Sequence, residues 1–162
     1  MRLLILTGLL ALLSAFPALG QLPAGRILDP DIENRDAIEV SLQNPSLNRG
    51  IVGVIGITAD EVDSLFKLCE REGLIVFVQT DDQALATKIR SRADAAQLLG
   101  KRVFITTGSL KNIHLGNNVA DRIFVRNALV GGVPETEVMR VLRPRGIAKI
   151  ANQQRIKPVP AG

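Results

Sequence analysis

Strand-like apolar runs alternate with stretches of helical periodicity along most of this 162-residue chain. The strand-like runs cover residues 51–55, 74–78, 103–106, 122–125 and 146–150. The helix-like stretches cover residues 32–42, 59–72, 83–99 and 135–142, and a long loop is expected at residues 109–118. Strands that are apolar on both faces must be covered on both faces, as in a parallel sheet between helices. The sequence therefore predicts an α/β fold with a mostly parallel sheet and flanking helices.

Glycine and aspartate set the expected ends of the helices. Gly73 and Gly100 each follow a helical stretch, and glycine is the residue that most often ends a helix. Asp81 or Asp82 is expected to cap the helix over residues 83–99, because a short acidic side chain accepts hydrogen bonds from the first free amides. These signals separate the elements clearly in the middle of the chain.

The first 20 residues have the layout of a secretory signal peptide. Arg2 precedes an apolar stretch over residues 3–19, and Gly20 provides a small residue at the expected cleavage site. The stretch is also close to the roughly 18 to 20 residues that cross a bilayer, so an uncleaved anchor is the alternative. We expect a secreted or periplasmic protein, with a signal peptide at residues 1–20, that touches a membrane only through an uncleaved signal.

The rest of the chain predicts one folded domain between two less regular segments. Residues 21–30 are rich in helix and strand breakers and are interpreted as a linker. Residues 31–150 carry the alternating elements and have enough apolar residues for one core. Residues 151–162 form a basic tail that contains Pro158 and Pro160.

Composition and charge argue against two classes of function. The chain has no Trp, no Tyr and five Phe, which leaves few aromatic platforms for stacking bases, and we predict no nucleic-acid binding. Cys69 falls on the apolar side of an amphipathic helix, where a buried and inert thiol is expected. His114 has no second His, Cys or carboxylate at metal-ligand spacing, so we predict no metal site.

Ligands of parallel α/β sheets bind outside the carboxyl ends of the strands, where backbone amides and helix N-termini converge. The loops that matter are therefore residues 56–60, 79–82, 106–112 and 126–133. None of them offers a clear general base, so no catalytic residue is assigned.

Two segments of the chain resemble a known family. Residues 137–146 read EVMRVLRPRG, and residues 112–121 read NIHLGNNVAD. Together with the order of the elements, these segments resemble the class I S-adenosylmethionine-dependent methyltransferases, in particular those of type 11. In that family, similar sequence motifs precede the fifth strand and the fourth strand, respectively. The resemblance covers residues 31–150 and implies a Rossmann-like sheet with S-adenosylmethionine as the cofactor.

The resemblance also implies where the cofactor would bind. Gly56 and Ile57 match the glycine-rich loop that holds the cofactor's amino-acid end. Gln79 or Asp81 matches the acid that binds the ribose hydroxyls, and Ser109 matches the residue that faces adenine. The chain departs from the family at each place, since one loop glycine remains and neither Gln79 nor Ser109 is an acid. These departures predict weak or no catalysis.

Complete members of the family continue beyond the fifth strand with a helix and an antiparallel hairpin. We therefore expect a sheet that lacks the family's terminal strands and exposes an edge. A protein partner, a second copy of this chain or the tail would cover that edge, although Pro158 and Pro160 make the tail a poor strand.

These observations together predict an exported methyltransferase-like domain with weak or no S-adenosylmethionine-dependent activity. The alternative is a non-catalytic scaffold or interaction domain of the cell envelope. Export favours the alternative, because the family's cofactor is made and kept in the cytoplasm.

Overall fold

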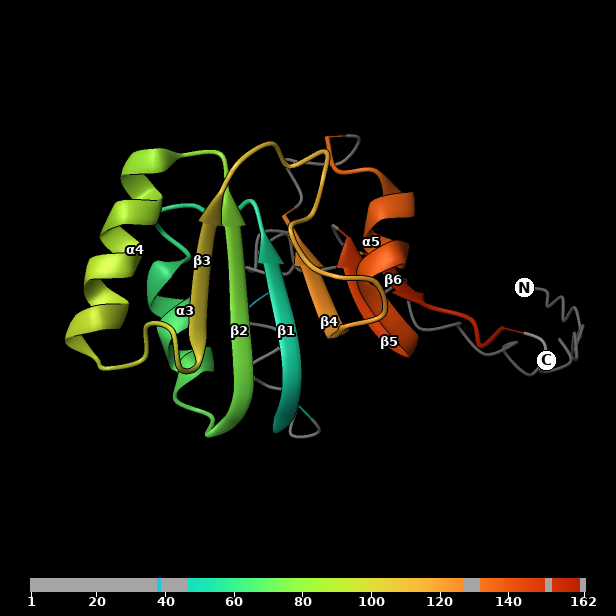
Figure 1. The fold of residues 1–162 in the computed structure, drawn as a ribbon, viewed down its shortest axis with the longest axis horizontal. Helices are drawn as coiled ribbons and strands as arrows, with labels where there is room; N and C mark the ends of the chain where they lie inside the picture. Colours follow the sequence, from blue (N-terminus) through green and yellow to red (C-terminus); the bar gives the residue numbers. More distant parts are fainter. Residues whose placement is uncertain (1–37, 39–46, 127–131, 151–152, 161–162) are drawn as a thin grey trace, which may run out of the picture.

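A computed structural model describes residue 38 and residues 47–126, 132–150 and 153–160 (Figure 1). The predicted signal peptide and linker lie outside the described residues, as does the predicted helix over 32–42 apart from Ile38, which is helical and buried. The strands are β1 (Arg49–Ile55), β2 (Gly73–Thr80), β3 (Val103–Thr107), β4 (Ala120–Val125), β5 (Leu142–Ile150) and β6 (Gln153–Ile156). The helices are α3 (Val62–Cys69), α4 (Gln83–Ala95) and α5 (Glu135–Val141).

The six strands form one sheet in the order β3-β2-β1-β4-β5-β6. Strands β1 to β5 pair in parallel, and β6 is antiparallel to β5. The mostly parallel α/β sheet predicted from the apolar runs is confirmed. Figure 1 shows β1 near the middle of the sheet, with β3 and β6 at the two edges of the described part.

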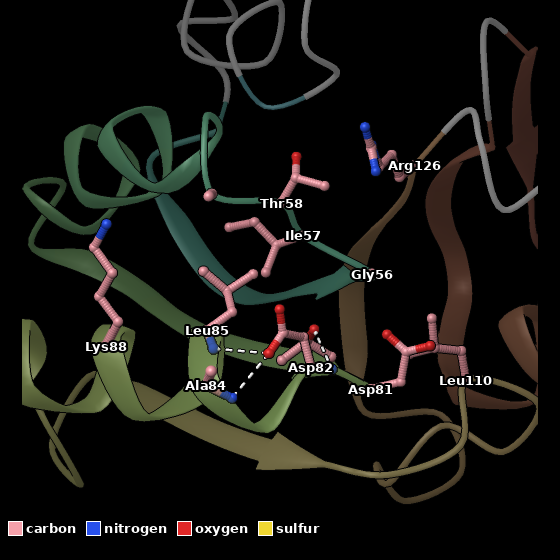
Figure 2. A pocket seen from close by; sticks show the side chains of 12 residues that line it. Gly56, Ile57, Thr58, Asp81, Asp82, Ala84, Leu85, Lys88, Leu110 and Arg126 are labelled. Carbon is pink, nitrogen blue, oxygen red and sulfur yellow. Dashed lines mark hydrogen bonds between the residues drawn. The ribbon is translucent and has the colours of Figure 1, made fainter.

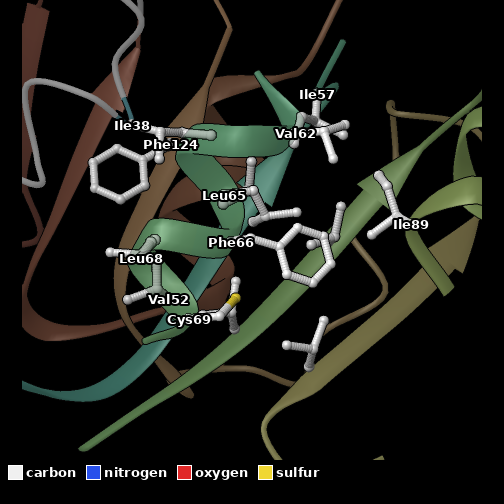
Figure 3. Close-up of a cluster of buried hydrophobic side chains, with 14 of the residues drawn as sticks. Ile38, Val52, Ile57, Val62, Leu65, Phe66, Leu68, Cys69, Ile89 and Phe124 are labelled. Atoms are coloured by element: carbon white, nitrogen blue, oxygen red, sulfur yellow. The ribbon is translucent and has the colours of Figure 1, made fainter. Parts of the chain in front are cut away.

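The helices cover the two faces of the sheet with separate cores. Helices α3 and α4 pack on one face against the buried side chains of β1 and β2, and Ile38 joins this core (Figure 3). Helix α5 packs on the other face, over β4 and β5, where it meets side chains from the loop between β3 and β4. Alternate residues of β1 point to opposite cores, as Val54 and Ile55 show.

The first core contains the chain's one cysteine. Cys69 lies on α3 and is 1% exposed, as expected from the apolar face of this helix (Figure 3). Burial raises the pKa of the Cys69 thiol to about 12. The thiolate is therefore scarce at neutral pH, and the side chain is a packing residue.

Two expected helix ends are corrected by the structure. Helix α3 ends at Cys69, and Gly73 is instead the first residue of β2, where a Cβ would lie 2.1 Å from the carbonyl oxygen of Asn48. Helix α4 ends at Ala95, before Gly100, because Gln97 turns the chain with a φ of 57°. Gly73 is thus needed for close strand approach rather than for ending a helix.

The carboxyl-terminal strands also differ from expectation. Strand β5 begins at Leu142, directly after α5, and includes an irregular stretch with Arg145 at a φ of 65°. The tail provides β6, so the prediction that it would be a poor strand is wrong for Gln153–Ile156. Pro158 and Pro160 lie beyond this pairing and do not interrupt it. In the segments described, no helix combines the length and apolarity that crossing a bilayer requires.

Candidate functional site

An open cleft of about 470 Å³ lies at the carboxyl ends of β1 and β2 (Figure 2). The loop after β1, the end of β2 and the first turns of α4 provide most of its wall. The lining residues are Gly56, Ile57, Thr58, Ala59, Thr80, Asp81, Asp82, Ala84, Leu85, Lys88, Leu110 and Arg126. This is where a parallel sheet presents backbone amides to a ligand.

Gly56 begins the loop after β1 in a conformation that suits glycine. Its φ is +75°, in the left-handed region where a side chain is strained. Its amide donates to the carbonyl oxygen of Gln79 at 2.8 Å, so the loop is tied to β2. Ile57 follows with a buried side chain and lines the cleft, so both residues assigned to the amino-acid end lie at the cleft.

The rest of the loop after β1 is held in place by hydrogen bonds to the carboxylate of Glu61, which belongs to the same loop. Glu61 Oε2 accepts from the amide and from the hydroxyl of Thr58, each at 2.8 Å. These two bonds close the turn over residues 58–61 that leads into α3. The Thr58 amide is therefore occupied by Glu61 and is not available to an anionic ligand group. Arg126 approaches the same carboxylate at 3.9 Å.

The two acids after β2 have different surroundings. Asp82 caps α4, because its Oδ1 accepts from the amides of Ala84 at 2.8 Å and Leu85 at 3.0 Å (Figure 2). Asp81 is exposed at the cleft, and its carboxylate has no hydrogen-bond or ion-pair partner within residues 47–126, 132–150 and 153–160. Of the two candidate caps, Asp82 is the cap, which leaves the Asp81 carboxylate available to a ligand.

Gln79 and Ser109 do not line the cleft. Gln79 is 0% exposed, and its amide is engaged with the loop between β3 and β4. The Ser109 hydroxyl accepts from the Lys111 amide at 3.3 Å, while Leu110 presents its side chain to the cleft. The structure thus brings Gly56, Ile57 and Asp81 together in the cleft lining, whereas Gln79 and Ser109 lie next to lining residues without lining the cleft themselves.

Nine of the twelve lining residues were not assigned to the site from the sequence, and three of these nine show why. Leu85 and Lys88 come from the first two turns of α4, and Leu110 comes from the loop after β3. The alternation of the elements places the start of α4 next to the end of β2, so the first two could have been found from the fold. Leu110 lay within the loop singled out from the sequence, but nothing in its apolar side chain distinguished it.

The cleft carries charges of both signs and no metal-ligand cluster. Asp81 and Asp82 contribute negative charge, and Lys88 and Arg126 contribute positive charge (Figure 2). No group of three or more His, Cys, Asp or Glu side chains close enough to hold a metal ion occurs among the described residues. The lining is therefore suited to an organic ligand with polar groups at an otherwise apolar surface.

No protein-family model and no curated protein matches the chain, but solved structures match its fold. A geranyl diphosphate methyltransferase in complex with S-adenosylmethionine matches with a TM-score of 0.57 and 16% identity, over 68% of this chain and 44% of that one. A geranyl diphosphate C-methyltransferase from Streptomyces coelicolor, solved with S-adenosyl-L-homocysteine, matches with a TM-score of 0.54 and 14% identity, over 62% of this chain and 37% of that one. The [4+2]-cyclase SpnF matches with a TM-score of 0.57 and 17% identity, over 68% of this chain and 42% of that one.

The chain spans 37–44% of the length of these three structures. Identities of 14–17% establish a shared fold and leave the chemistry open. The described sheet and helices thus have the Rossmann-like fold of S-adenosylmethionine-dependent methyltransferases.

Proposed function

We propose that the cleft binds S-adenosylmethionine or its demethylated product, and that the chain transfers methyl groups weakly or not at all. The observation that carries the proposal is the meeting of Gly56, Asp81 and Leu110 in one cleft at the carboxyl ends of the strands. Solved methyltransferases with this cofactor or its product bound share the fold.

Each part of such a ligand has a suitable neighbour in the cleft. Among the described residues the exposed Asp81 carboxylate has no partner, so it can accept two hydrogen bonds, which fits the paired hydroxyls of a ribose. Leu85 and Leu110 offer an apolar surface for a purine ring, and the backbone at Gly56 and Ile57 offers a close approach for an amino-acid group. When bound, S-adenosylmethionine supplies a methyl group on a sulfonium centre, which is electrophilic.

Weak catalysis is proposed because the Asp81 carboxylate is assigned to the ribose and no other residue of the described lining has a clear role as a base. Asp82 is used as a helix cap, and the Glu61 carboxylate closes its own loop. The Arg126 guanidinium offers only N–H donors and no acceptor atom, so it does not serve as a base. The [4+2]-cyclase that shares this fold adds a reason to keep fold and reaction separate.

A non-catalytic scaffold is the second candidate, and the two sheet edges favour it. The outer sides of β3 and β6 have no neighbouring strand in the described sheet. An unpaired edge can accept a strand from a partner protein or from a second copy. Sedimentation of the full chain over a hundredfold concentration range would reveal self-association, and a constant monomer mass would exclude the second copy as the occupant.

Export is also a proposal, and it rests on residues 1–20 of the sequence. Mass spectrometry of the protein recovered from expressing cells would show cleavage after Gly20 as the loss of those 20 residues. An intact amino terminus on a membrane-bound product would support the uncleaved anchor instead, and an intact terminus on a cytoplasmic product would contradict export.

Calorimetric titration of the folded full chain with S-adenosylmethionine and S-adenosylhomocysteine tests the binding proposal. We expect saturable binding that Asp81→Asn weakens about tenfold, because an amide accepts hydroxyl hydrogens less strongly than a carboxylate. Asp94→Asn is the matched control, since Asp94 lies on the exposed side of α4 outside the cleft lining. Absence of binding by the folded wild-type chain would overturn the proposal.

A further inference from the structure

We propose that Gln79 is a positioning residue that holds the loop between β3 and β4. It thereby fixes the position of Leu110, whose side chain forms one part of the cleft lining, called here the Leu110 wall. The part that concerns ligand selectivity rests on the proposed function. The part that concerns the loop rests on contacts within the chain alone.

Gln79 has a fully buried side chain with three well-placed partners. Its Nε2 donates to the carbonyl oxygen of Ser109 at 3.0 Å and to that of Asn112 at 2.8 Å. Its Oε1 accepts from the amide of His114 at 2.8 Å. One side chain at 0% exposure therefore fixes three backbone groups within a six-residue stretch. Buried amide groups are costly to leave unpaired, so this arrangement strongly favours one loop conformation.

Leu110 lies between the first two of these anchors. It is 7% exposed and lines the cleft, whereas the Ser109 side chain beside it does not. The hydrogen bonds from β2 to Ser109 and Asn112 both come from Gln79. The Gln79 amide thus holds the backbone on both sides of Leu110, next to the hydrogen bond from the Gly108 amide to the Thr80 carbonyl oxygen at 3.2 Å.

The residue type at position 79 follows from this role. The two carbonyl oxygens of Ser109 and Asn112 require two N–H donors, and a neutral carboxamide provides them. A carboxylate at the same place would accept from His114 but would face both carbonyl oxygens with negative charge. The loop therefore explains why this chain has glutamine where the related family uses an acid to bind a ribose.

Helix α5 holds the other half of the same loop and provides a control. Glu137 Oε2 accepts from the Ile113 amide at 3.1 Å, and Arg140 donates to the carbonyl oxygens of Ile113 at 2.7 Å and Leu115 at 2.9 Å. These contacts act on residues 113–115, including the peptide unit that joins Asn112 to Ile113, and none of them binds the carbonyl oxygen of Ser109 or Asn112. Loosening them should leave Leu110 in place.

Amide hydrogen exchange and methyl NMR of the full chain without ligand test the loop. In Gln79→Met, which removes the acceptor, we expect exchange at the His114 amide to rise at least about tenfold, and in both Gln79→Met and Gln79→Glu we expect the Leu110 methyl signals to shift. Glu137→Gln is the control, and it should speed exchange at Ile113 without moving the Leu110 signals. Unchanged His114 exchange in Gln79→Met and unchanged Leu110 signals in both Gln79 variants would overturn the inference.

Ligand titration separates this inference from the proposed function. We expect Gln79→Met to weaken binding of S-adenosylhomocysteine and 5′-methylthioadenosine about tenfold, and to leave binding of methionine unchanged. Equal losses for methionine would show a general loss of structure and contradict a role at the Leu110 wall. Failure of the folded wild-type chain to bind any of these probes would overturn the proposed function, and the exchange measurement would still decide whether Gln79 holds the loop.

Discussion

At the scale of single residues, the cleft depends on backbone conformations that only a few side chains permit. Gly56 has a φ of +75° at the cleft, and Gly100 has a φ of +70° in a turn that has open space around it. Both positions require a left-handed backbone conformation, and of the two only Gly56 lines the candidate site. The pair therefore separates a conformational effect from a binding effect.

We predict that Gly56→Ala and Gly100→Ala each lower the free energy of unfolding by about 1 kcal/mol, because a Cβ is disfavoured in the left-handed region. Urea unfolding would measure both values. Only Gly56→Ala should also weaken ligand binding in the titration described above. Equal binding by the two variants would show that the loop after β1 does not contact the ligand.

At the scale of elements, α5 and the loop before β4 are joined by a charged clamp. Glu137 and Arg140 pair at 2.8 Å on α5, and both bind backbone groups of residues 113–115. Arg140 also donates to the Asn117 side chain at 2.8 Å. The clamp supports a stretch that has no regular secondary structure, and it does so from the helix rather than from the sheet.

The clamp predicts a pH dependence of stability. Hydrogen bonding to Arg140 holds the pKa of Glu137 below its usual 4.5. A carboxyl whose pKa is lower in the folded state stabilises the fold fully above 4.5, and that stabilisation is lost as the pH falls through the folded-state pKa. We expect Glu137→Gln to reduce the acid-induced loss of unfolding free energy by about 1 kcal/mol.

Chemical unfolding at pH 7 and at progressively lower pH would test this expectation. Glu72→Gln provides the control, because Glu72 is exposed and outside the clamp. An identical pH profile for the wild type and Glu137→Gln would contradict a folded-state role for the Glu137 carboxylate.

The sequence predicted the central elements well and the carboxyl-terminal ones poorly. Strands β1 and β2 are buried on both faces for much of their length, so continuous apolar runs identified them. Strand β6 consists of Gln153–Ile156, all exposed, and it exists because β5 provides a pairing edge. Local sequence pattern cannot reveal a strand that depends on a distant partner.

The candidate site was predicted in part for a similar reason. Gly56, Ile57 and Asp81 follow strand ends directly, so their positions come from the order of elements. The engagement of Gln79 depends on carbonyl groups about 30 residues later in the chain. No sequence pattern connects those carbonyl groups to Gln79. Only the folded structure shows that the Gln79 side-chain amide is already hydrogen-bonded.

At the scale of the whole molecule, the tail connects the elements of the carboxyl-terminal half of the sheet through contacts of Lys157. Lys157 Nζ donates to the carbonyl oxygens of Met139 at 2.6 Å and Leu142 at 2.7 Å, and to the Asn118 side chain at 2.7 Å. Its backbone also bonds to Arg145 and Gly146. One residue thus connects β6 to the end of α5 and to the loop before β4.

We predict that Lys157→Met lowers the free energy of unfolding by about 2 kcal/mol, because a charged donor with several carbonyl partners is removed. Thermal and urea unfolding would measure the loss. Lys101→Met, at an exposed turn before β3, should change stability by less than about 0.5 kcal/mol. Equal effects of the two substitutions would show that the tail contributes little to the fold.

The strand order also has a consequence for how the chain is made. Strands β1, β2 and β3 and their helices all lie within residues 49–107, so this half of the sheet can pair before β4 leaves the ribosome. The halves then join through β1 and β4, which share only the four residue pairs from Val52–Arg122 to Ile55–Val125. We expect pulse-labelled exchange to show β2 protected before β4. Until β1 pairs with β4, the free edge of β1 can pair with a strand of another chain, so this interval is the one in which misassembly is favoured.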